Sequence, residues 1–477
     1  MRDAGKPDAM SMSQYLWSAA EALRLQVRPA IGENAPRDAL DNSIRVLTAV
    51  ANALDPASPV PVPAAFASAE QADCDRLNGP PENAAAHRQT GHAIARLAQE
   101  IDAGGDLSND DSRAAIAWER AALLASVARY DAVERAEATQ SGSDGSQIEP
   151  AALERYLRNW SGDTSLTIEN FKLITGGRSR QTALFEISGS DSLPRGMVVQ
   201  RGIPGQQVSS SFVGEATQFA LLSMLYAAGM RVPRPILVEE DEAPLGARFL
   251  IVERSPGSPA LTDYWGNVSS QQLVLDLAGE MAKLHSQPFD TLLGTLPVSR
   301  TDSSVAGWRA DIDQLAAVWT SLAHWPSLTM SAAIAWLRSN ADAPDDRQAI
   351  VHNDMVFHNI LGQDGRITAV LDWEQANIGH PGEDLGYCYP YVSAVVDWDR
   401  FMQAYRDAGG PNIPQRQIDF FALRGGLRLM TLVLHGGRES FEKGLSNDVL
   451  VASAGAHFSQ RLLNRIAGVL ETVLARS

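Results

Sequence analysis

Three polar side chains in the stretch VHNDMVFHNILGQDGRITAVLDWE, residues 351–374, have the types and spacing to carry out chemistry together. Asp354 and Asp372 lie in or beside apolar runs, where a carboxylate is costly unless it binds a metal, pairs with a base or reacts. Asn359 follows Asp354 by five positions. Two acids and an amide suit phosphoryl transfer, in which one acid accepts or orients a hydroxyl proton. The amide and the second acid then hold Mg²⁺ against nucleotide phosphates.

The local pattern predicts that one loop and one hairpin bring these groups together. The run NILGQDGRITAVLDW alternates apolar and polar residues on both sides of Gln-Asp-Gly at 363–365, which indicates a β-hairpin. Asn359 and Asp372 then flank the open end of that hairpin. The apolar strand AIV leads into the loop that carries Asp354. We therefore expect the first acid, the amide and the second acid to meet in one place.

The same residues resemble a known group of enzymes. The pattern His352-x-Asp354-x4-Asn359, followed by Asp-Trp-Glu at 372–374, is similar to the catalytic loop and metal-binding motif of aminoglycoside phosphotransferases and choline-kinase-like enzymes. These small-molecule kinases are relatives of the protein kinases, and the resemblance covers residues 151–477. The segment MVVQRGIPG, with an arginine followed by a Pro-Gly turn, looks more like the branch of this group associated with acyl-CoA dehydrogenases than like the antibiotic-resistance enzymes.

The resemblance implies a role for each of these residues. Asp354 would be the catalytic base, and His352 would brace its loop. Asn359 and Asp372 would bind Mg²⁺. Asp384, in HPGEDLGY, matches an acid that fixes the loop. ATP is the expected phosphate donor, although the sequence leaves GTP open.

The preceding part of the chain matches the same group less fully. Gly176 and Gly177 lie between two predicted strands, where such enzymes fold a loop over the phosphates. Glu215, on the predicted helix after the third strand, matches a glutamate that pairs with a cation of that strand. FLIVERSPG matches the segment between the two lobes, where the backbone near Glu253 and Ser255 would meet the adenine.

The expected cation departs from the pattern. Most relatives have a lysine in the third strand, whereas MVVQRGIPG offers Arg201. Arginine stays charged and can bind phosphate as a fork, but its geometry differs from that of lysine. We expect Arg201 to pair with Glu215 and to face the phosphates, and a surface ion pair is the alternative.

Composition limits the partners and the compartment. The net charge of −17 repels nucleic acid and anionic lipid, so we expect neither a nucleic acid nor a membrane as a partner. The two cysteines, Cys74 and Cys388, form no disulfide framework and suit a reducing compartment. No run approaches 18 apolar residues, and the first residues lack an apolar signal segment. A cytoplasmic location is the expectation.

The chain is long enough for two or three domains. Residues 1–140 are Ala-rich with a helical period, and 141–150 have the polar, small composition of a linker. Residues 151–257 read as antiparallel strands around one helix, and 258–477 as mostly helical. With the resemblance, the expected fold class is α+β: a bilobal protein-kinase-like fold preceded by an all-α helical domain. The role of that domain, including homo-oligomerisation through it, stays open.

The combined prediction is an ATP- and Mg²⁺-dependent enzyme that phosphorylates a hydroxyl of a small molecule. The branch that the chain resembles implies a hydroxyacyl-CoA or another catabolic alcohol as the acceptor. Such a polyanion needs local cations, and Arg424 and Arg428 stand one turn apart on a late predicted helix. A solvated helix face is the plainer interpretation of these two arginines.

Several alternatives stay beside this prediction. The first is an aminoglycoside phosphotransferase that confers antibiotic resistance, and the second is a catalytically inactive kinase-like binding module. His352 and His358 near Asp354 could suggest a metallohydrolase, but the chain has no HExxH motif. A protein kinase is less favoured, because Asn353 follows His352 where most protein kinases have arginine, and because Asp-Trp-Glu is not Asp-Phe-Gly.

Overall fold

The computed structural model describes residues 97–104, 110, 112–121, 123–124, 148–174, 180–202, 212–261, 268–299, 302–322, 327–434 and 449–476. Most of the predicted N-terminal domain, the first part of the predicted linker, and Gly176 and Gly177 lie outside these residues. The chain divides into two compact units, one of 144–308 and 341–425 and one of 1–143, 309–340 and 426–477. The domain boundaries expected from the sequence stay a prediction. No described helix is both long and apolar enough to cross a membrane.

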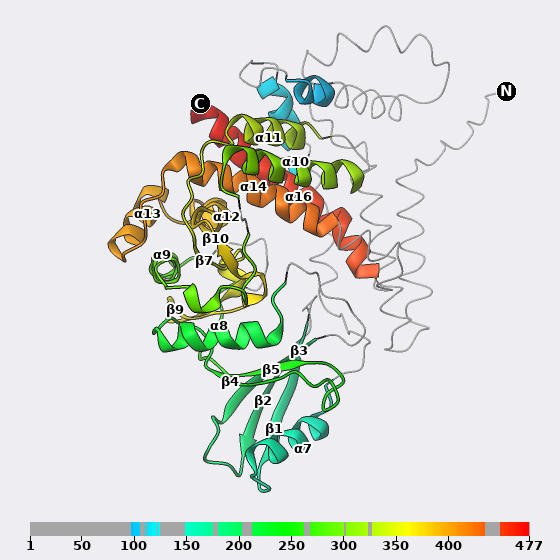
Figure 1. The fold of residues 1–477 in the computed structure, drawn as a ribbon, viewed down its shortest axis with the longest axis vertical. Helices are drawn as coiled ribbons and strands as arrows, with labels where there is room; N and C mark the ends of the chain where they lie inside the picture. The colour runs from blue at the N-terminus through cyan, green and yellow to red at the C-terminus, as the bar shows by residue number, and fades with distance from the viewer. Residues whose placement is uncertain are drawn as a thin grey trace, which may run out of the picture. The chain divides into compact units, whose positions relative to one another are not determined.

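The first half of the 144–308/341–425 unit is an antiparallel sheet of five strands in the order β1-β2-β3-β5-β4 (Figure 1). The strands are β1 (Thr167–Ile174), β2 (Arg180–Ser188), β3 (Gly196–Gly202), β4 (Pro235–Glu239) and β5 (Phe249–Glu253). Helix α7 (Pro150–Ser161) precedes the sheet, and helix α8 (Glu215–Ala227) connects β3 to β4. This order of three strands, a helix and two strands is the one that the sequence predicts.

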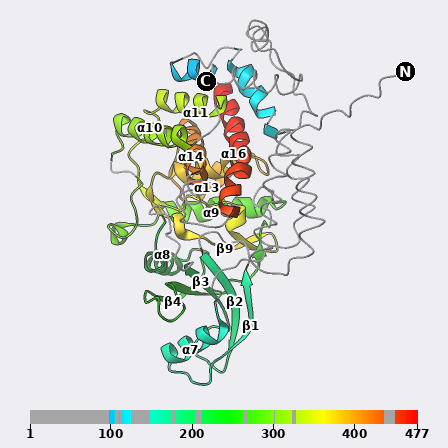
Figure 2. The ribbon, with the colours of Figure 1, turned by 90° about the vertical axis from the view of Figure 1, so that its right-hand side faces the viewer.

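The sheet separates two environments, because side chains alternate between its faces. On one face, Phe185, Met197 and Val199 form a buried cluster with Leu153 and Leu157 of α7. Helix α8 contacts β4 and β5 and lies on the other side of the sheet from α7 (Figures 1 and 2). Odd-numbered residues of β2 and β3 therefore face the core with α7, and even-numbered residues face the side of α8.

The rest of this unit is mainly helical, with short strands embedded in it. One small sheet pairs β10 with β7, and another has three strands in the order β6-β8-β9. The elements are β6 (Ser258–Pro259), α9 (Gln271–His285), η3 (Asp290–Leu292), β7 (Ala349–Val351), η4 (Phe357–Asn359), β8 (Ile360–Gln363), β9 (Arg366–Val370), η5 (Trp373–Gln375), β10 (Asn377–Gly379), α12 (Gly382–Val392) and α13 (Trp398–Asp407). Helices α10 (Val305–Leu322) and α14 (Gln415–Leu434) have residues in both units.

The predicted hairpin is present as β8 and β9. Its turn places Asp364 at φ 53° and Gly365 at φ 73°. Two successive residues with positive φ are what a tight two-residue hairpin turn requires, which explains the Asp-Gly pair. The antiparallel sheet, the helical second half and the strands within it confirm the predicted α+β fold class.

In the other unit, helices from distant parts of the sequence pack together. They include α11 (Leu328–Ser339) and α16 (Val449–Arg476), which contact each other, and the helical residues 112–121. The buried Glu119 accepts hydrogen bonds from Leu328 N at 3.2 Å and from Thr329 N at 2.6 Å, at the start of α11. The described end of the N-terminal region thus supplies a cap to a helix more than 200 residues away in the chain.

Candidate active site

Asp354 and Asn359 lie at the two ends of the loop that follows β7, and both are buried. Nδ2 of Asn359 donates hydrogen bonds to Asp354 O at 3.0 Å and to Asp354 Oδ2 at 2.9 Å. The amide is thereby oriented, and its oxygen is left as the atom that could bind a cation. Oδ1 of Asp354 is buried and has no hydrogen-bond partner among the described residues. A buried carboxylate oxygen without a partner is costly unless a ligand supplies one.

Asp372 lies beside this pair because the hairpin closes at its open end. Leu371 N donates to Asn359 O at 2.8 Å, so the residue before Asp372 is fixed to Asn359. Asp372 itself has φ 64°, a left-handed conformation that is uncommon outside glycine and that turns the chain sharply between β9 and η5. The structure thus brings together the three groups that the sequence predicts to meet.

The charges of the two acids oppose each other. Removal of water from the carboxyl group, together with the negative charge of Asp354, raises the pKa of Asp372 to about 6. The direction of this change is the one expected for two acids that share one place. A bound cation would relieve this repulsion.

Asp354 stays ionised through its neighbours. Burial alone would raise its pKa, but the Asp354 pKa is lowered by His358 and by a hydrogen bond from Tyr387. Nε2 of His358 lies 3.5 Å from Oδ2 of Asp354. The sequence interpretation assigned no role to either of these two contacts. His358 could have been found from its i,i+4 spacing to the acid, whereas Tyr387 reaches it only through the tertiary fold.

His352 is a neutral brace between the loop and the hairpin. Its Nε2 lies 2.9 Å from the carbonyl oxygen of Leu371, and its Nδ1 accepts a hydrogen bond from Asp354 N at 3.2 Å. A carbonyl only accepts and a backbone amide only donates, so the proton is on Nε2. Burial lowers the pKa of His352, in agreement with the neutral ring. The ring also lies 4.5 Å from that of Trp373.

Asp384 follows Glu383 in the first turn of α12 and holds the backbone of the loop. It accepts hydrogen bonds from His352 N at 2.9 Å and from Asn353 N at 2.6 Å. His285 Nε2 lies 3.1 Å from Oδ2 of the same acid. Burial opposes ionisation of Asp384, but the contact with His285 outweighs it and keeps the Asp384 pKa lowered. Three donors on one fully buried carboxylate fix the loop rigidly.

The comparisons with known proteins identify the family. Residues 170–418, which are 249 of the 477 residues, match the APH family model, described as the phosphotransferase enzyme family. The chain belongs to this family. A solved structure of a phosphotransferase-family neighbour, a putative aminoglycoside phosphotransferase from Ralstonia eutropha, superposes with a TM-score of 0.50 at 17% identity. The match covers 68% of this chain and 99% of that one, and it supports the kinase-like fold.

Two known proteins are similar in sequence to parts of the chain. Acyl-CoA dehydrogenase family member 11 from Gallus gallus is 29% identical over 174 residues, which are 36% of this chain and 22% of the relative. Hygromycin-B 4-O-kinase from Escherichia coli is 25% identical over 162 residues, 31% of this chain and 46% of the relative. The match therefore spans only a fifth of the length of the first relative and less than half of the second.

Arg201 does not have the position expected for the cation of this phosphotransferase site. It belongs with Met197 and Val199 to the odd-numbered positions of β3, on the face packed against α7. Its guanidinium donates to Leu245 O at 2.6 Å and to the side chain of Gln181. Burial lowers the pKa of Arg201. The expected pairing of Arg201 with Glu215 is therefore corrected: strand parity turns Arg201 away from α8.

Arg180 is the cation that meets Glu215. It is the first residue of β2, and its Nη2 lies 3.6 Å from Oε1 of Glu215. Its Nε lies 3.7 Å from Oε2 of Glu374, in the Asp-Trp-Glu run. Sequence reasoning missed Arg180 because it assumed a cation in the third strand. The signal that could have found it is an arginine in β2 whose side chain points to the opposite face of the sheet from Arg201.

In the segment where the adenine is expected, two successive backbone amides are already hydrogen-bonded within the protein. The amides of Glu253 and Arg254 donate to Arg234 O at 2.8 Å and to Gly196 O at 2.9 Å. The amide of Ser255 is the next along the chain, followed by Pro256, which has none. The carboxylate of Glu253 is held by Nε of Arg234 at 2.6 Å, so an adenine contact at Glu253 would be made by its backbone.

Arg424 is not on a solvated face. It is buried, and its Nη1 lies 3.4 Å from Oε2 of Glu383 while its guanidinium lies 5.4 Å from the ring centre of Trp308. Arg428, one turn later, is half-buried. The solvated-face interpretation is therefore wrong for Arg424, which is held inside the helical part by an acid and an aromatic ring.

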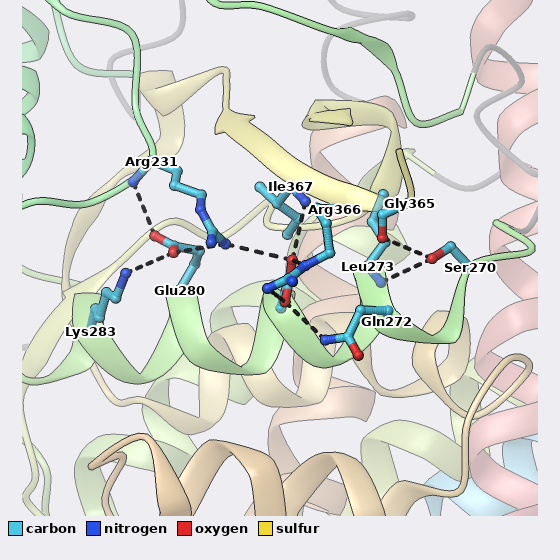
Figure 3. Close-up of polar contacts among 10 residues, drawn as sticks. Arg231, Ser270, Gln272, Leu273, Glu280, Lys283, Gly365, Arg366 and Ile367 are labelled. Atoms are coloured by element: carbon cyan, nitrogen blue, oxygen red, sulfur yellow. Dashed lines mark hydrogen bonds and ion pairs between the residues drawn. The ribbon is translucent and has the colours of Figure 1, made fainter. Parts of the chain in front are cut away.

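The hairpin is fastened to α9 by a polar network (Figure 3). Arg366 at the start of β9 donates to Asp276 through Nε at 2.6 Å and Nη2 at 2.9 Å. Arg231, just before β4, donates its amide to Glu280 at 3.1 Å, and its carbonyl accepts from Val370 N at 2.7 Å. The strand that leads to Asp372 is thus fixed at both of its ends.

Proposed function

We propose that this phosphotransferase transfers the γ-phosphoryl group of ATP to a hydroxyl of a small molecule, with Asp354 as base and Asn359 and Asp372 as Mg²⁺ ligands. The observation that carries the proposal is the meeting of these three groups, one of which keeps a buried carboxylate oxygen without a partner. Membership of the phosphotransferase enzyme family supports the same reaction class.

Asp354 has the state and the geometry of a proton acceptor. The contacts of Oδ2 with Asn359 and His358 stabilise the ionised form and fix the plane of the carboxylate. Oδ1 then remains to accept a hydrogen bond from the acceptor hydroxyl. It would take the hydroxyl proton as the new O–P bond forms, while the bond from the γ-phosphorus to the bridging oxygen of ATP breaks and ADP leaves. Orientation of the hydroxyl matters most, because positioning and charge carry most of the catalysis in phosphoryl transfer.

The donor set fits Mg²⁺. The oxygens of Asn359 and Asp372 are hard ligands, and the repulsion between Asp372 and Asp354 favours a cation beside them. Among the described residues, no three histidine, cysteine or acidic side chains are grouped closely enough to hold a metal ion alone. A Mg²⁺ bound by Asn359 and Asp372 would keep water and phosphate oxygens as its other ligands. When bound, the ion would neutralise charge on the transferred phosphoryl group.

Other residues have supporting roles in the proposal. His352 and Asp384 hold the loop, and the backbone near Glu253 and Ser255 would meet the adenine. Gly176 and Gly177 stay proposed as the turn over the phosphates on the strength of the sequence alone. The described contacts favour Arg180, instead of Arg201, as the cation that pairs with Glu215.

For the acceptor, we favour a hydroxyacyl-CoA or a related catabolic alcohol. The support is the similarity to acyl-CoA dehydrogenase family member 11 from several animals, of which this chain spans 22–43%. A CoA thioester is polyanionic and would need a local cation. Of Arg424 and Arg428 on α14, Arg428 is the more accessible. The similarity to hygromycin-B 4-O-kinase favours an aminoglycoside as the second candidate.

A competition assay would separate the candidates. Purified full chain is incubated with Mg·ATP and a panel of hydroxyacyl-CoA thioesters, simple alcohols and aminoglycosides, and ADP release is followed with Asp354→Asn as the inactive control. We expect a higher kcat/KM for the thioesters, and Arg428→Ala should raise their KM. Efficient turnover of aminoglycosides alone would favour the resistance enzyme. Nucleotide binding without turnover of any acceptor would favour the inactive binding module.

A further inference from the structure

Arg180 lies at the centre of a buried network between β2, α8 and η5. Its Nη1 donates to Oε1 of Gln218 at 2.8 Å, and its Nη2 donates to Val213 O at 3.1 Å. The two acids within ion-pair distance are Glu215, at 3.6 Å, and Glu374, at 3.7 Å. All the side chains in this network are largely removed from water.

Burial makes the members of this network depend on one another. A guanidinium or a carboxylate taken out of water is costly unless an opposite charge and hydrogen bonds compensate it. Arg180 supplies the compensation for both Glu215 and Glu374, while Gln218 and Val213 O satisfy the donors that point toward α8. Removal of the arginine would take one cation away from both Glu215 and Glu374.

The network reaches the proposed metal ligand through two residues of chain. Glu374 comes two positions after Asp372, and its carbonyl oxygen accepts from Val213 N at 2.8 Å. The backbone bond therefore ties η5 to the segment just before α8, and the ion pair of Glu374 with Arg180 ties η5 to β2. The positive charge of Arg180 also acts on Asp372, whose pKa it lowers against the opposite effect of Asp354.

The alternation of side chains along a strand explains why Arg180, and not Arg201, lies beside Glu215. Gln181 and Arg201 are register partners on the α7 face, and Arg180, next to Gln181, points to the opposite face. A cation that is to meet α8 must therefore have the parity of Arg180.

We infer that Arg180 is the positioning residue of this phosphotransferase site: by holding Glu374 against α8, it sets the place of Asp372 for the metal. The inference rests on the proposed function and adds to it a dependence of the metal site on β2 and α8. Arg180 acts through Glu374, so its loss should weaken the Mg²⁺-dependent part of nucleotide binding and spare the part that ATP retains without metal.

Titration calorimetry of the full chain tests this inference. ATP is titrated in Mg²⁺ and in EDTA into the wild type, Arg180→Met, Arg180→Lys, Glu374→Gln and the control Arg201→Met, which removes a buried arginine from the other face. Loss of a residue that orients a metal ligand costs about 10–100-fold in metal affinity. We expect Arg180→Met and Glu374→Gln each to raise the Kd for Mg·ATP by about tenfold or more, with little change in EDTA.

The remaining variants separate positioning from general damage. Arg180→Lys should recover part of the affinity, because it restores the charge without the fork. The double variant Arg180→Met/Glu374→Gln should lose less than the sum of the single changes, since the two residues act as one pair. If Arg180→Met does not fold, Arg180→Lys and Glu374→Gln still decide the question.

The outcomes distinguish the inference from the proposed function. If the wild type binds no nucleotide in either buffer, the proposed function fails. If the wild type binds Mg·ATP and Arg180→Met, Arg180→Lys and Glu374→Gln bind it as tightly as the wild type does, the inference is overturned and the proposed function stands. An equal loss of affinity in Mg²⁺ and in EDTA would also overturn it, because that result would indicate direct contact with the nucleotide or a disturbed fold.

Discussion

Nδ2 of Asn359 lies 2.9 Å from Oδ2 of Asp354 and 3.0 Å from its carbonyl oxygen, so one amide group orients the acid from two directions. The bond uses one carboxylate oxygen and leaves the other, Oδ1, buried without a partner among the described residues. Because Nδ2 makes these bonds, the amide oxygen of Asn359 is left as the atom that could bind a cation. A single side-chain contact thus separates the atom that we propose as the proton acceptor from the atom that we propose as a metal ligand.

Asp354→Asn should keep the fold and nucleotide binding but lower kcat by about 10²–10⁴, the usual contribution of a positioned base. The amide has nearly the shape of the carboxylate but cannot accept the hydroxyl proton. Turnover with the best acceptor of the panel and calorimetry with Mg·ATP would measure the two effects. Turnover within a few-fold of the wild type would remove Asp354 from the role of base.

Mg²⁺-dependent binding of ATP should weaken as the pH falls below about 6, the value to which the pKa of Asp372 is raised. A carboxyl group must lose its proton to bind the metal, so acid competes with Mg²⁺. For stability the sign is opposite. An acid whose pKa is higher in the folded state favours folding at low pH, and this contribution is lost as the pH rises from about 4 to about 6.

Asp372→Asn is the matched variant for this prediction. It should abolish most of the Mg²⁺-dependent binding at neutral pH and remove the pH dependence, while ATP binding in EDTA stays. Titrations at several values between pH 5 and 8 would show both effects. A wild-type affinity for Mg·ATP that does not change over this range would contradict the assignment of Asp372.

Gly386→Ala should destabilise the protein and lower turnover. A methyl group at Gly386, within α12, would meet Ala422 N at 2.5 Å and Phe421 C at 2.6 Å, both backbone atoms that cannot move aside alone. Helix α12 would have to shift, and with it Asp384 and Tyr387. Overpacking of this kind costs about 1–3 kcal/mol, which urea unfolding would measure.

The control for this variant is Gly279→Ala, also within a helix, α9. A methyl group there meets nothing within 4 Å. Because alanine favours a helix over glycine by about 1 kcal/mol, the free energy of unfolding should stay the same or rise. Equal effects of the two substitutions would mean that the close approach of α12 to the chain at 421–422 has no energetic importance.

Glu119→Ala should lower the free energy of unfolding by about 1–3 kcal/mol, because it leaves buried donors at the start of α11 without an acceptor. The donors are Leu328 N, Thr329 N and Thr329 Oγ1, the last at 2.6 Å. Glu119→Gln keeps one acceptor oxygen and should lose less. Tryptophan fluorescence during urea unfolding is a suitable measurement, and unchanged stability of Glu119→Ala would show that α11 does not depend on this cap.

The sequence alone determined the features that depend on local spacing. The five-residue interval from Asp354 to Asn359 and the turn residues Asp364 and Gly365 specify a loop and a hairpin whose ends meet. The alternating strands after residue 151 predicted an antiparallel sheet, because side-chain period and turn chemistry are properties of neighbouring residues. The family followed from the same motifs.

Only the tertiary structure decided which residues support these groups. The sequence favoured Arg201 as the cation, but pairing of β2 with β3 puts it on the α7 face and gives Glu215 to Arg180. In the same way, Tyr387 meets Asp354 across 33 positions of sequence, and Glu119 caps a helix that begins at Leu328. The physical reason is that face and contact depend on register and packing between segments far apart in the chain, which no local pattern records.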